Sequence, residues 1–488
     1  MTNDEFSARG FGVDFSSFVI WISSFGTSPR LSSRSHPSAS QLTRERVNHA
    51  PVNRFLYNVG FHIFFACSAP FYFLKMWRRG NWQAGFGQRF ARYDSKFKQA
   101  ITNRDIIWFH AVSVGEVNIC TQLIKALEPR APNLKIVVSS TTSTGMAELQ
   151  KKLPSHISKI YYPIDVRGYV RRAFRLISPE AVVLVEAEIW PNFLWRARDL
   201  GKPVFLVNAR LSEKSHRGYK KWSFLFGPLF RSFAGVGCQN EADAKRLEEI
   251  GCRKERIHVV GNLKFDAATV TEKRLLDVPR LLAQLGVAPD AQLIVAGSTH
   301  AGEEKILGEV FLRLRARFPN LFLVVVPRHH ERGRDAGREL ETAGVKFVYR
   351  NEITPATQRA PGEVDALLVN TTGELRYFYD HATAVFVGKS LTADGGQNPI
   401  EPGARAKPMV FGPNMQNFEA IAKLLVERGG ALQVPDAAEL ERALAEILGN
   451  PDRAAKIGAN AQAVVKENLG SIERTVEMIL AQLPKHAR

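Results

Sequence analysis

The stretch IIWFHAVSVGEV, residues 106–117, contains the strand-to-helix transition that decides the fold. Its first seven residues are mostly β-branched or aromatic, as in a buried strand. Ser113 and Glu116 then give the S-x-x-E pattern of a helix N-terminus, and a helical pattern follows over residues 117–127. A buried strand that leads directly into a helix is the repeating unit of a parallel sheet.

The same alternation of apolar strands and longer helical patterns recurs in two sets along the chain. It predicts an α/β protein with two doubly wound parallel sheets. Such sheets bind ligands at the carboxyl ends of their strands, and we expect the two domains to face each other across a cleft. The further strands predicted from apolar runs span residues 135–139, 181–186 and 203–208 in the first set, and 292–296, 321–326, 365–369, 384–387 and 408–411 in the second.

The chain has 488 residues, enough for two or three domains with complete cores. Residues 1–51 are rich in Ser, Arg and Asn and have the composition of a flexible leader; an alternative is that the natural protein begins near Val52. The other predicted parts are an N-terminal domain over residues 81–265, a hinge over 266–285, a C-terminal domain over 286–470 and a last helix over 471–488.

Residues 55–74 form an apolar run of about the length that crosses a bilayer, although Asn58, His62 and Pro70 interrupt it. Cations and indoles follow directly, as at a membrane interface. These are Lys75, Trp77, Arg78, Arg79 and Trp82. We therefore predict a membrane anchor over residues 52–80 that spans the bilayer or lies in its interface, with the remaining chain in the cytoplasm. The alternative is a buried amphipathic helix of the first domain.

The composition favours an anionic partner, because the formal net charge is +18 and the pI is about 9.8. Nucleic acid, phospholipid and a phosphorylated substrate all satisfy this condition. The four cysteines are widely spaced, which favours reduced thiols over a disulfide framework or a zinc site. The chain contains no complete P-loop, G-x-G-x-x-G or H-E-x-x-H motif and no Asp-x-Asp metal pair, so kinase, dehydrogenase and metalloprotease functions lose support.

Candidate reactive carboxylates follow the predicted strands of the first half. Glu116 is either the second member of a capping box or an ionised general base at a helix N-terminus, where Gly115 lets a substrate approach. Glu186 and Glu188 follow another apolar strand, where two carboxylates are costly unless they bind something polar. Helix caps or salt bridges are the alternative for this pair.

Polar loops after the strands of the second half predict a nucleotide site. Helix starts with free amides can hold phosphate, and the carboxylate of Glu401 could accept hydrogen bonds from ribose hydroxyls. The loops are AGSTHAGEE at 296–304, Arg328 with His329 at the end of a strand, NTTGEL at 370–375, and the segment with Gly395, Gly396, Asn398 and Glu401.

Eight motifs together resemble those of the 3-deoxy-D-manno-octulosonic acid (Kdo) transferases. The resemblance covers about residues 52–470. It implies a GT-B glycosyltransferase, with two Rossmann-like domains and a cytoplasmic active site, anchored to the inner membrane. Such an enzyme transfers Kdo from CMP-Kdo to the lipid A precursor lipid IVA and needs neither a bound metal nor a cofactor. The motifs are HAVSVGEV, EAEIWPN, NARLSEKS, GNLKFD, GSTHAGEE, VPRHHER, NTTGEL and GGQNPIEP.

The resemblance also implies roles for individual residues. Glu116 corresponds to the general base, and Lys264 with either Glu186 or Glu188 corresponds to groups that stabilise the transition state. Gln397 stands where many relatives have His, which leaves the details of the nucleotide pocket open. The residues matched to cytidylate binding are Pro327, Arg328, Thr372, Gly373 and Glu374, with Asn398, Pro399, Ile400 and Glu401 closing the pocket.

Two rival functions agree with the same features. One is a GT-B transferase that uses a UDP-sugar. The other is a basic, membrane-bound binding protein without catalysis, for example one that binds nucleic acid. No RNP, zinc-finger or helix-turn-helix signature is present, and we expect no nucleic-acid partner.

Overall fold

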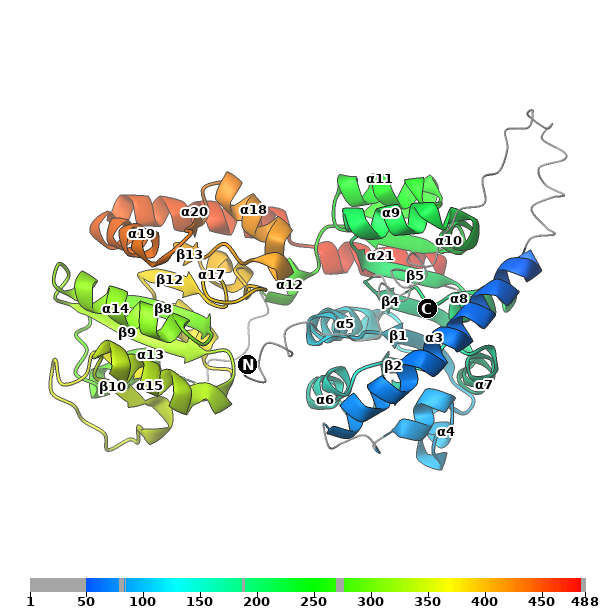
Figure 1. The fold of residues 1–488 in the computed structure, drawn as a ribbon, viewed down its shortest axis with the longest axis horizontal. Helices are drawn as coiled ribbons and strands as arrows, with labels where there is room; N and C mark the ends of the chain where they lie inside the picture. Colours follow the sequence, from blue (N-terminus) through cyan, green and yellow to red (C-terminus); the bar gives the residue numbers. More distant parts are fainter. Residues whose placement is uncertain (1–49, 79–82, 84, 187–188, 269–275, 484–488) are drawn as a thin grey trace. The chain divides into compact units, whose positions relative to one another are not determined.

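The computed structural model describes residues 50–78, 83, 85–186, 189–268 and 276–483. The chain forms two compact units (Figure 1). The N-terminal unit contains the described residues up to Leu263 and those from Gly470 onward, and the C-terminal unit spans Lys264–Leu469. The predicted leader lies almost entirely outside the described residues, as does the central part of the predicted hinge.

Among the described residues, the N-terminal unit contains a seven-stranded parallel sheet in the order β3-β2-β1-β4-β5-β6-β7. In β1, Trp108 lies opposite Val137 and Val182 of the neighbouring strands. Trp108 belongs to the core on one face of the sheet and Phe109 to the core on the other, as the alternation of a strand requires. The strands are β1 (Asp105–His110), β2 (Leu134–Ser140), β3 (Ser158–Tyr161), β4 (Pro179–Val185), β5 (Val204–Ala209), β6 (Gly235–Cys238) and β7 (Ile257–Val259).

Helices cover both faces of this sheet, because a parallel sheet buries both faces. The last helix of the chain is one of them: Val476 and Ile479 belong to the core of the N-terminal unit. A Cβ on Gly235 of β6 would lie 3.2 Å from the Met478 sulfur, so this glycine makes room for the helix. The helices are α4 (Ser95–Ile101), α5 (Val114–Leu127), α6 (Ser143–Lys152), α7 (Arg167–Ile177), α8 (Pro191–Asp199), α9 (Glu213–Lys221), α10 (Ser223–Phe230), α11 (Glu241–Glu249) and α21 (Ser471–Gln482).

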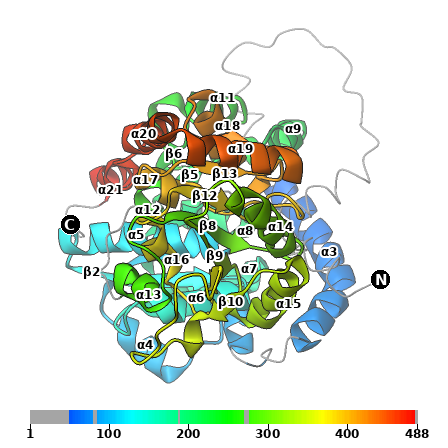
Figure 2. The ribbon, with the colours of Figure 1, turned by 90° about the vertical axis from the view of Figure 1, so that its left-hand side faces the viewer.

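In the described part of the chain, the C-terminal unit has a second seven-stranded parallel sheet in the order β10-β11-β9-β8-β12-β13-β14. Its helices can be followed in Figure 2. The strands are β8 (Gln292–Thr299), β9 (Leu321–Pro327), β10 (Phe347–Tyr349), β11 (Ala366–Leu368), β12 (Ala384–Val387), β13 (Met409–Phe411) and β14 (Leu432–Gln433). The helices are α12 (Lys264–Ala268), α13 (Val278–Gln284), α14 (Glu303–Arg315), α15 (Gly333–Ala343), α16 (Leu375–Tyr379), α17 (Ile400–Ala404), α18 (Glu419–Glu427), α19 (Ala437–Gly449) and α20 (Pro451–Glu467).

Each sheet reverses its winding direction at one place. In the N-terminal unit the chain runs from β1 outward to β3 and returns to β4 on the other side of β1, and in the C-terminal unit it runs from β8 outward and returns to β12. Doubly wound sheets bind ligands at the carboxyl ends of the two strands that flank such a switch point. The prediction of two doubly wound α/β domains is confirmed, whereas a cleft between them stays a prediction.

The first described helix, α3 (Ala50–Arg78), packs against the N-terminal unit with one face. Tyr57 and Phe61 are buried there and contact Trp195 and Trp190 with their rings. Among the described residues, no helix has the length and apolar character needed to cross a membrane. The spanning form of the predicted anchor is therefore not supported, because polar residues interrupt the apolar run, and the packed face agrees with the alternative of an amphipathic helix.

Candidate functional site

Glu116 lies in the first turn of α5, directly after β1. The Glu116 amide donates to the Ser113 hydroxyl oxygen at 3.2 Å, and the Glu116 carboxylate accepts from the Ser113 hydroxyl at 2.7 Å and from the Val112 amide at 2.8 Å. The Ser113 cap of the capping alternative is therefore formed, and the Glu116 carboxylate reaches back to the Val112 amide and the Ser113 hydroxyl. Its donors and the helix N-terminus favour a charged carboxylate. The same carboxylate lies at the switch point of the sheet, and its role as a base stays a prediction.

Glu186 follows β4, the other strand at this switch point. It has a left-handed backbone with φ 62°, and Asn208 at the end of β5 has φ 54°. The side-chain amide nitrogen of Asn208 donates to the Glu186 carboxylate at 3.2 Å. The side-chain oxygen of Asn208 accepts from the backbone amide of Leu263 at 3.2 Å. Two adjacent strained residues at strand ends are typical of functional sites. Asn208 was not predicted as a site residue, although its place at the end of a buried strand beside β4 was a usable signal; Glu188 lies outside the described residues.

Lys264 begins α12 and belongs to the C-terminal unit. Its ammonium group donates to the Asn417 carbonyl at 3.4 Å and lies 5.0 Å from the centre of the Phe418 ring. These contacts hold the cation beside the loop that precedes α18.

Arg328 and Glu401 are brought together at the carboxyl edge of the second sheet. Pro327 ends β9, and the Arg328 amide donates to the Thr299 carbonyl of β8 at 3.0 Å. Glu401 is half-buried in the first turn of α17. Burial raises the pKa of its carboxyl group, whereas the charges of Arg405, Arg376 and Arg328 and a hydrogen bond from Asn398 lower it.

The segment over residues 398–401 has a fixed backbone. The Asn398 side-chain amide donates to the Glu401 carboxylate at 3.1 Å, and its oxygen accepts from the Ile400 amide at 3.0 Å. Pro399 precedes the first residue of α17, and Ile400 is buried. These contacts place the Glu401 carboxylate among the arginines of this edge.

The turn over residues 372–374 is held mainly by contacts within the protein. Gly373 has φ 86°, and the Glu374 carboxylate accepts from the Thr371 hydroxyl at 2.7 Å and pairs with Arg350 at 3.0 Å. Glu374 therefore closes its own turn. The Thr372 hydroxyl lies 3.4 Å from the His330 imidazole.

The loop over residues 296–304, predicted to bind phosphate, is occupied by carboxylates of the protein itself. The Gly302 amide, at the start of α14, donates to both oxygens of Glu339 at 3.0 and 2.9 Å. The buried Glu303 carboxylate accepts from the His300 amide at 2.9 Å, and Glu304 pairs with Arg332 at 2.8 Å. The amides of His300 and Gly302 are therefore taken by carboxylates of the protein and do not face a phosphate.

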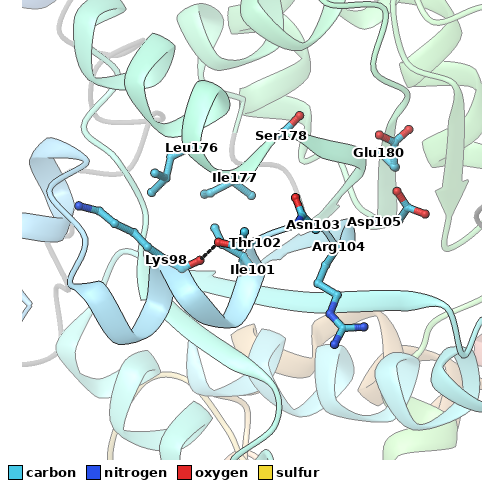
Figure 3. A pocket seen from close by; sticks show the side chains of 10 residues that line it. All are labelled: Lys98, Ile101, Thr102, Asn103, Arg104, Asp105, Leu176, Ile177, Ser178 and Glu180. Carbon is cyan, nitrogen blue, oxygen red and sulfur yellow. Dashed lines mark hydrogen bonds between the residues drawn. The ribbon is translucent and has the colours of Figure 1, made fainter.

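A cavity of about 450 Å³ lies at the opposite edge of the first sheet (Figure 3). Its walls come from α4 and from the segments that enter β1 and β4, and they include Lys98, Asp105 and Glu180. None of the predicted site residues lines this cavity. Within the described ranges, no group of three or more His, Cys, Asp or Glu side chains is placed to hold a metal ion.

Comparisons with known proteins agree with the motifs. Residues 84–267 match the family model of 3-deoxy-D-manno-octulosonic-acid transferase (kdotransferase). The 3-deoxy-D-manno-octulosonic acid transferase of Bordetella pertussis is 32% identical over 429 residues, which cover 84% of this chain and 96% of the relative. The enzyme of the same name from Haemophilus influenzae is 31% identical over 383 residues, which cover 78% and 88%.

A solved structure adds information on the fold alone. The UDP-GlcNAc 2-epimerase of Neisseria meningitidis superposes with a TM-score of 0.53 at 14% identity, over 77% of this chain and 100% of the epimerase. The relatives are similar over nearly their whole length, and the chain therefore belongs to the 3-deoxy-D-manno-octulosonic acid transferase family of glycosyltransferases.

Proposed function

We propose that the chain transfers Kdo from CMP-Kdo to the lipid A precursor lipid IVA, in lipopolysaccharide synthesis. The observation that carries the proposal is the placement of Arg328 and Glu401 at one sheet edge of a family member. Both groups match a nucleotide, because a guanidinium binds phosphate and a carboxylate accepts from ribose hydroxyls.

The donor is assigned to the C-terminal unit. No carboxylate of the described residues lies within ion-pair distance of the Arg328 guanidinium, whereas most arginines of this unit are paired within the protein. Arg328 would bind the phosphate of the cytidylate, and Glu401, fixed by Asn398, would bind the ribose. Lys264 adds a further positive charge for the departing phosphate.

The acceptor hydroxyl is assigned to Glu116. In this step the carboxylate takes the hydroxyl proton, and the acceptor oxygen forms a bond to the anomeric carbon of Kdo while the bond from that carbon to the phosphate oxygen breaks. The electron pair leaves with CMP. Attack opposite the leaving group inverts the anomeric centre. One of Glu186 or Glu188 would stabilise the charge that develops on the sugar.

The cytoplasmic face of the inner membrane is the proposed location. The face of α3 that points away from the N-terminal unit carries large exposed apolar side chains, with Phe55 exposed to 68% and Phe71 to 65%. Exposed arginines lie on α7 of the same unit, and such a combination favours association with an anionic membrane surface. The apolar side chains are Val52, Phe55, Leu56, Val59, Ile63, Phe71, Leu74 and Trp77.

One incubation tests the proposal. Purified protein is mixed with lipid IVA and CMP-Kdo, and the lipid product is weighed by mass spectrometry. We expect a mass increase by one or more Kdo units, and the mass also gives their number. Parallel reactions with UDP-sugars test the rival donor: transfer from a UDP-sugar and none from CMP-Kdo contradicts the proposal.

A further inference from the structure

Lys389 lies at the switch point of the second sheet. It follows Gly388 directly after β12, next to the end of β8. A Cβ on Gly388 would lie 2.5 Å from the Ser298 carbonyl oxygen, so the two strand-end segments are in close contact. This is the position at which doubly wound sheets bind their ligands. The sequence around it is not a P-loop, and the function assigned so far gives Lys389 no role.

The backbone of Lys389 is held in an unfavourable conformation by a buried carboxylate. Its φ is 53°, in the left-handed region that side chains other than Asn and Asp rarely adopt. The amides of Lys389, Ser390 and Leu391 donate to the buried Glu303 carboxylate at 2.7, 2.7 and 2.9 Å, and the Gly396 amide donates to the Lys389 carbonyl at 2.9 Å. A strained residue with so many fixed contacts indicates a functional constraint.

The side chain of Lys389 points toward the other loops of this edge. Its ammonium nitrogen lies 3.8 Å from the position that a Cβ on Gly395 would take. Gly395 and Gly396 are buried and have φ values of 126° and 67°, which favour glycine. Lys389 is half-buried, and Gly395 has no side chain that could cover its ammonium group.

Lys389 and Arg328 are two cations that act on the same imidazole, that of His329. No carboxylate of the described residues forms an ion pair with the Lys389 ammonium group or with Arg328. Burial lowers the pKa of His329, and the charges of Arg328, Arg332 and Lys389 lower it further, against the carboxylate of Glu331. The charge of Glu401 also acts on Arg328. Lys389 and Arg328 still repel each other near one imidazole, and a bound anion offsets this repulsion.

We propose that Lys389 binds the phosphate of the cytidine nucleotide together with Arg328, and that Glu303 is the positioning residue that holds Lys389 in place. The proposal rests on the proposed function, which supplies the nucleotide. Lysine binds phosphate as a compact point charge, and the arginine adds a planar pair of donors. The Glu303 carboxylate thus accepts hydrogen bonds from the backbone amides of the loop, and the ammonium group of Lys389 remains to bind the ligand.

The test compares CMP with cytidine, which lacks the phosphate, by calorimetry on the full chain. In Lys389→Met we expect the affinity for CMP to fall by about 10-fold or more, the scale of a lost charged hydrogen bond, and the affinity for cytidine to stay unchanged. Lys389→Arg should retain most of the CMP affinity. Lys456→Met, which removes an exposed lysine of α20, controls for net charge and should leave both affinities unchanged.

A glycine variant separates the ligand contact from a structural role. Lys389→Gly removes the ammonium group and also relieves the backbone, so its melting temperature should equal or exceed that of the parent while its CMP affinity falls. Ala406→Gly is the matched control, because Ala406 also has φ 53° in this unit and should keep its CMP affinity.

Two results for Lys389→Met overturn the assignment. One is an equal loss of affinity for CMP and for cytidine. The other is an unchanged CMP affinity, and a raised KM for CMP-Kdo beside it would move the contact to the sugar carboxylate. A parent protein that binds neither CMP nor cytidine contradicts the proposed function itself, before any variant is compared.

Discussion

The Tyr57 hydroxyl of α3 donates a 2.7 Å hydrogen bond to the buried carboxylate of Asp165. The same carboxylate accepts from the amides of Asn192 and Phe193 at 2.9 Å, at the N-terminus of α8. One side chain therefore joins the first described helix to the segment that follows Glu186 in the EAEIWPN motif. The exposed apolar face of α3 is thereby fixed relative to this part of the N-terminal unit.

Tyr57→Phe tests this connection. We expect a loss of about 1–2 kcal/mol in the free energy of unfolding, measured by urea denaturation, because a buried carboxylate loses a donor. Tyr93→Phe is the matched control: Tyr93 is also a buried tyrosine of this unit, and its hydroxyl has no hydrogen-bond partner among the described residues. Equal losses in the two variants would show that the bond to Asp165 contributes nothing.

The stability of the N-terminal unit should depend on pH through Asp165. Burial raises the pKa of Asp165 to about 7, although the hydrogen bonds from Tyr57, Asn192 and Phe193 lower it. Because the pKa in the folded state exceeds the ordinary value of 3.8, the folded state binds more protons than the unfolded state between these two pKa values. The contribution of Asp165 to stability therefore falls as the pH rises from about 4 to about 7. Relative to Asp165→Asn, the parent should lose unfolding free energy between pH 5 and about 7. A constant difference over this window would contradict the titration.

Substitutions at α5 separate catalysis from capping. Glu116→Gln keeps an acceptor for the helix N-terminus but cannot take a proton, so transfer of Kdo should fall by on the order of 10²-fold or more with little change in melting temperature or CMP affinity. Ser113→Ala removes the cap and should cost about 1 kcal/mol of stability while transfer continues. Full transfer activity in Glu116→Gln would show that Glu116 serves only as a helix cap.

Nucleotide affinity should weaken on acidification because of Glu401. Burial raises its pKa above the ordinary 4.5, so the carboxylate that we propose accepts from the ribose becomes protonated nearer to neutrality as the pH falls. Cytidine is the suitable ligand, because the phosphate of CMP titrates near pH 6 itself. The affinity of the parent for cytidine should fall as the pH is lowered from neutrality and should begin to fall above pH 4.5, whereas Glu401→Gln should bind cytidine weakly at every pH. A flat profile for the parent would exclude this role.

The outer face of α3 should govern membrane binding. The double variant Phe55→Ser/Phe71→Ser removes two exposed rings and should reduce cosedimentation with vesicles of phosphatidylethanolamine and phosphatidylglycerol several-fold, at an unchanged melting temperature. Val426→Ser, at an exposed apolar position of α18, is the control. Undiminished binding of the double variant would assign membrane contact to another surface.

The sequence predicted most of what depends on local pattern. Long apolar runs such as β8 and β9 are buried on both faces, and the S-x-x-E pattern at Glu116 formed the predicted cap. Short or glycine-containing strands such as β6 and β14 give too few residues for a periodicity.

What the sequence could not predict depends on residues distant along the chain. The amide of Gly302 is taken by Glu339, 37 positions later, and the amides after β12 are taken by Glu303. A free helix N-terminus and one filled by an internal carboxylate have the same local sequence. The apolar run of α3 was likewise ambiguous, because the aromatic residues that pack on Trp195 are the same kinds that face a membrane.

The position of α21 has a consequence for biosynthesis. Its apolar residues complete the core of the sheet that is translated first, beside Gly235, yet they are separated from β6 by the entire C-terminal unit. While the ribosome is still elongating the chain, α21 has not yet been made, so the surface of β6 that it covers stays exposed in the nascent N-terminal unit. Folding of this unit is completed only after the C-terminal end of the chain has been synthesised. A premature stop codon just before Gly470 would thus damage the half of the enzyme encoded at the opposite end of its message.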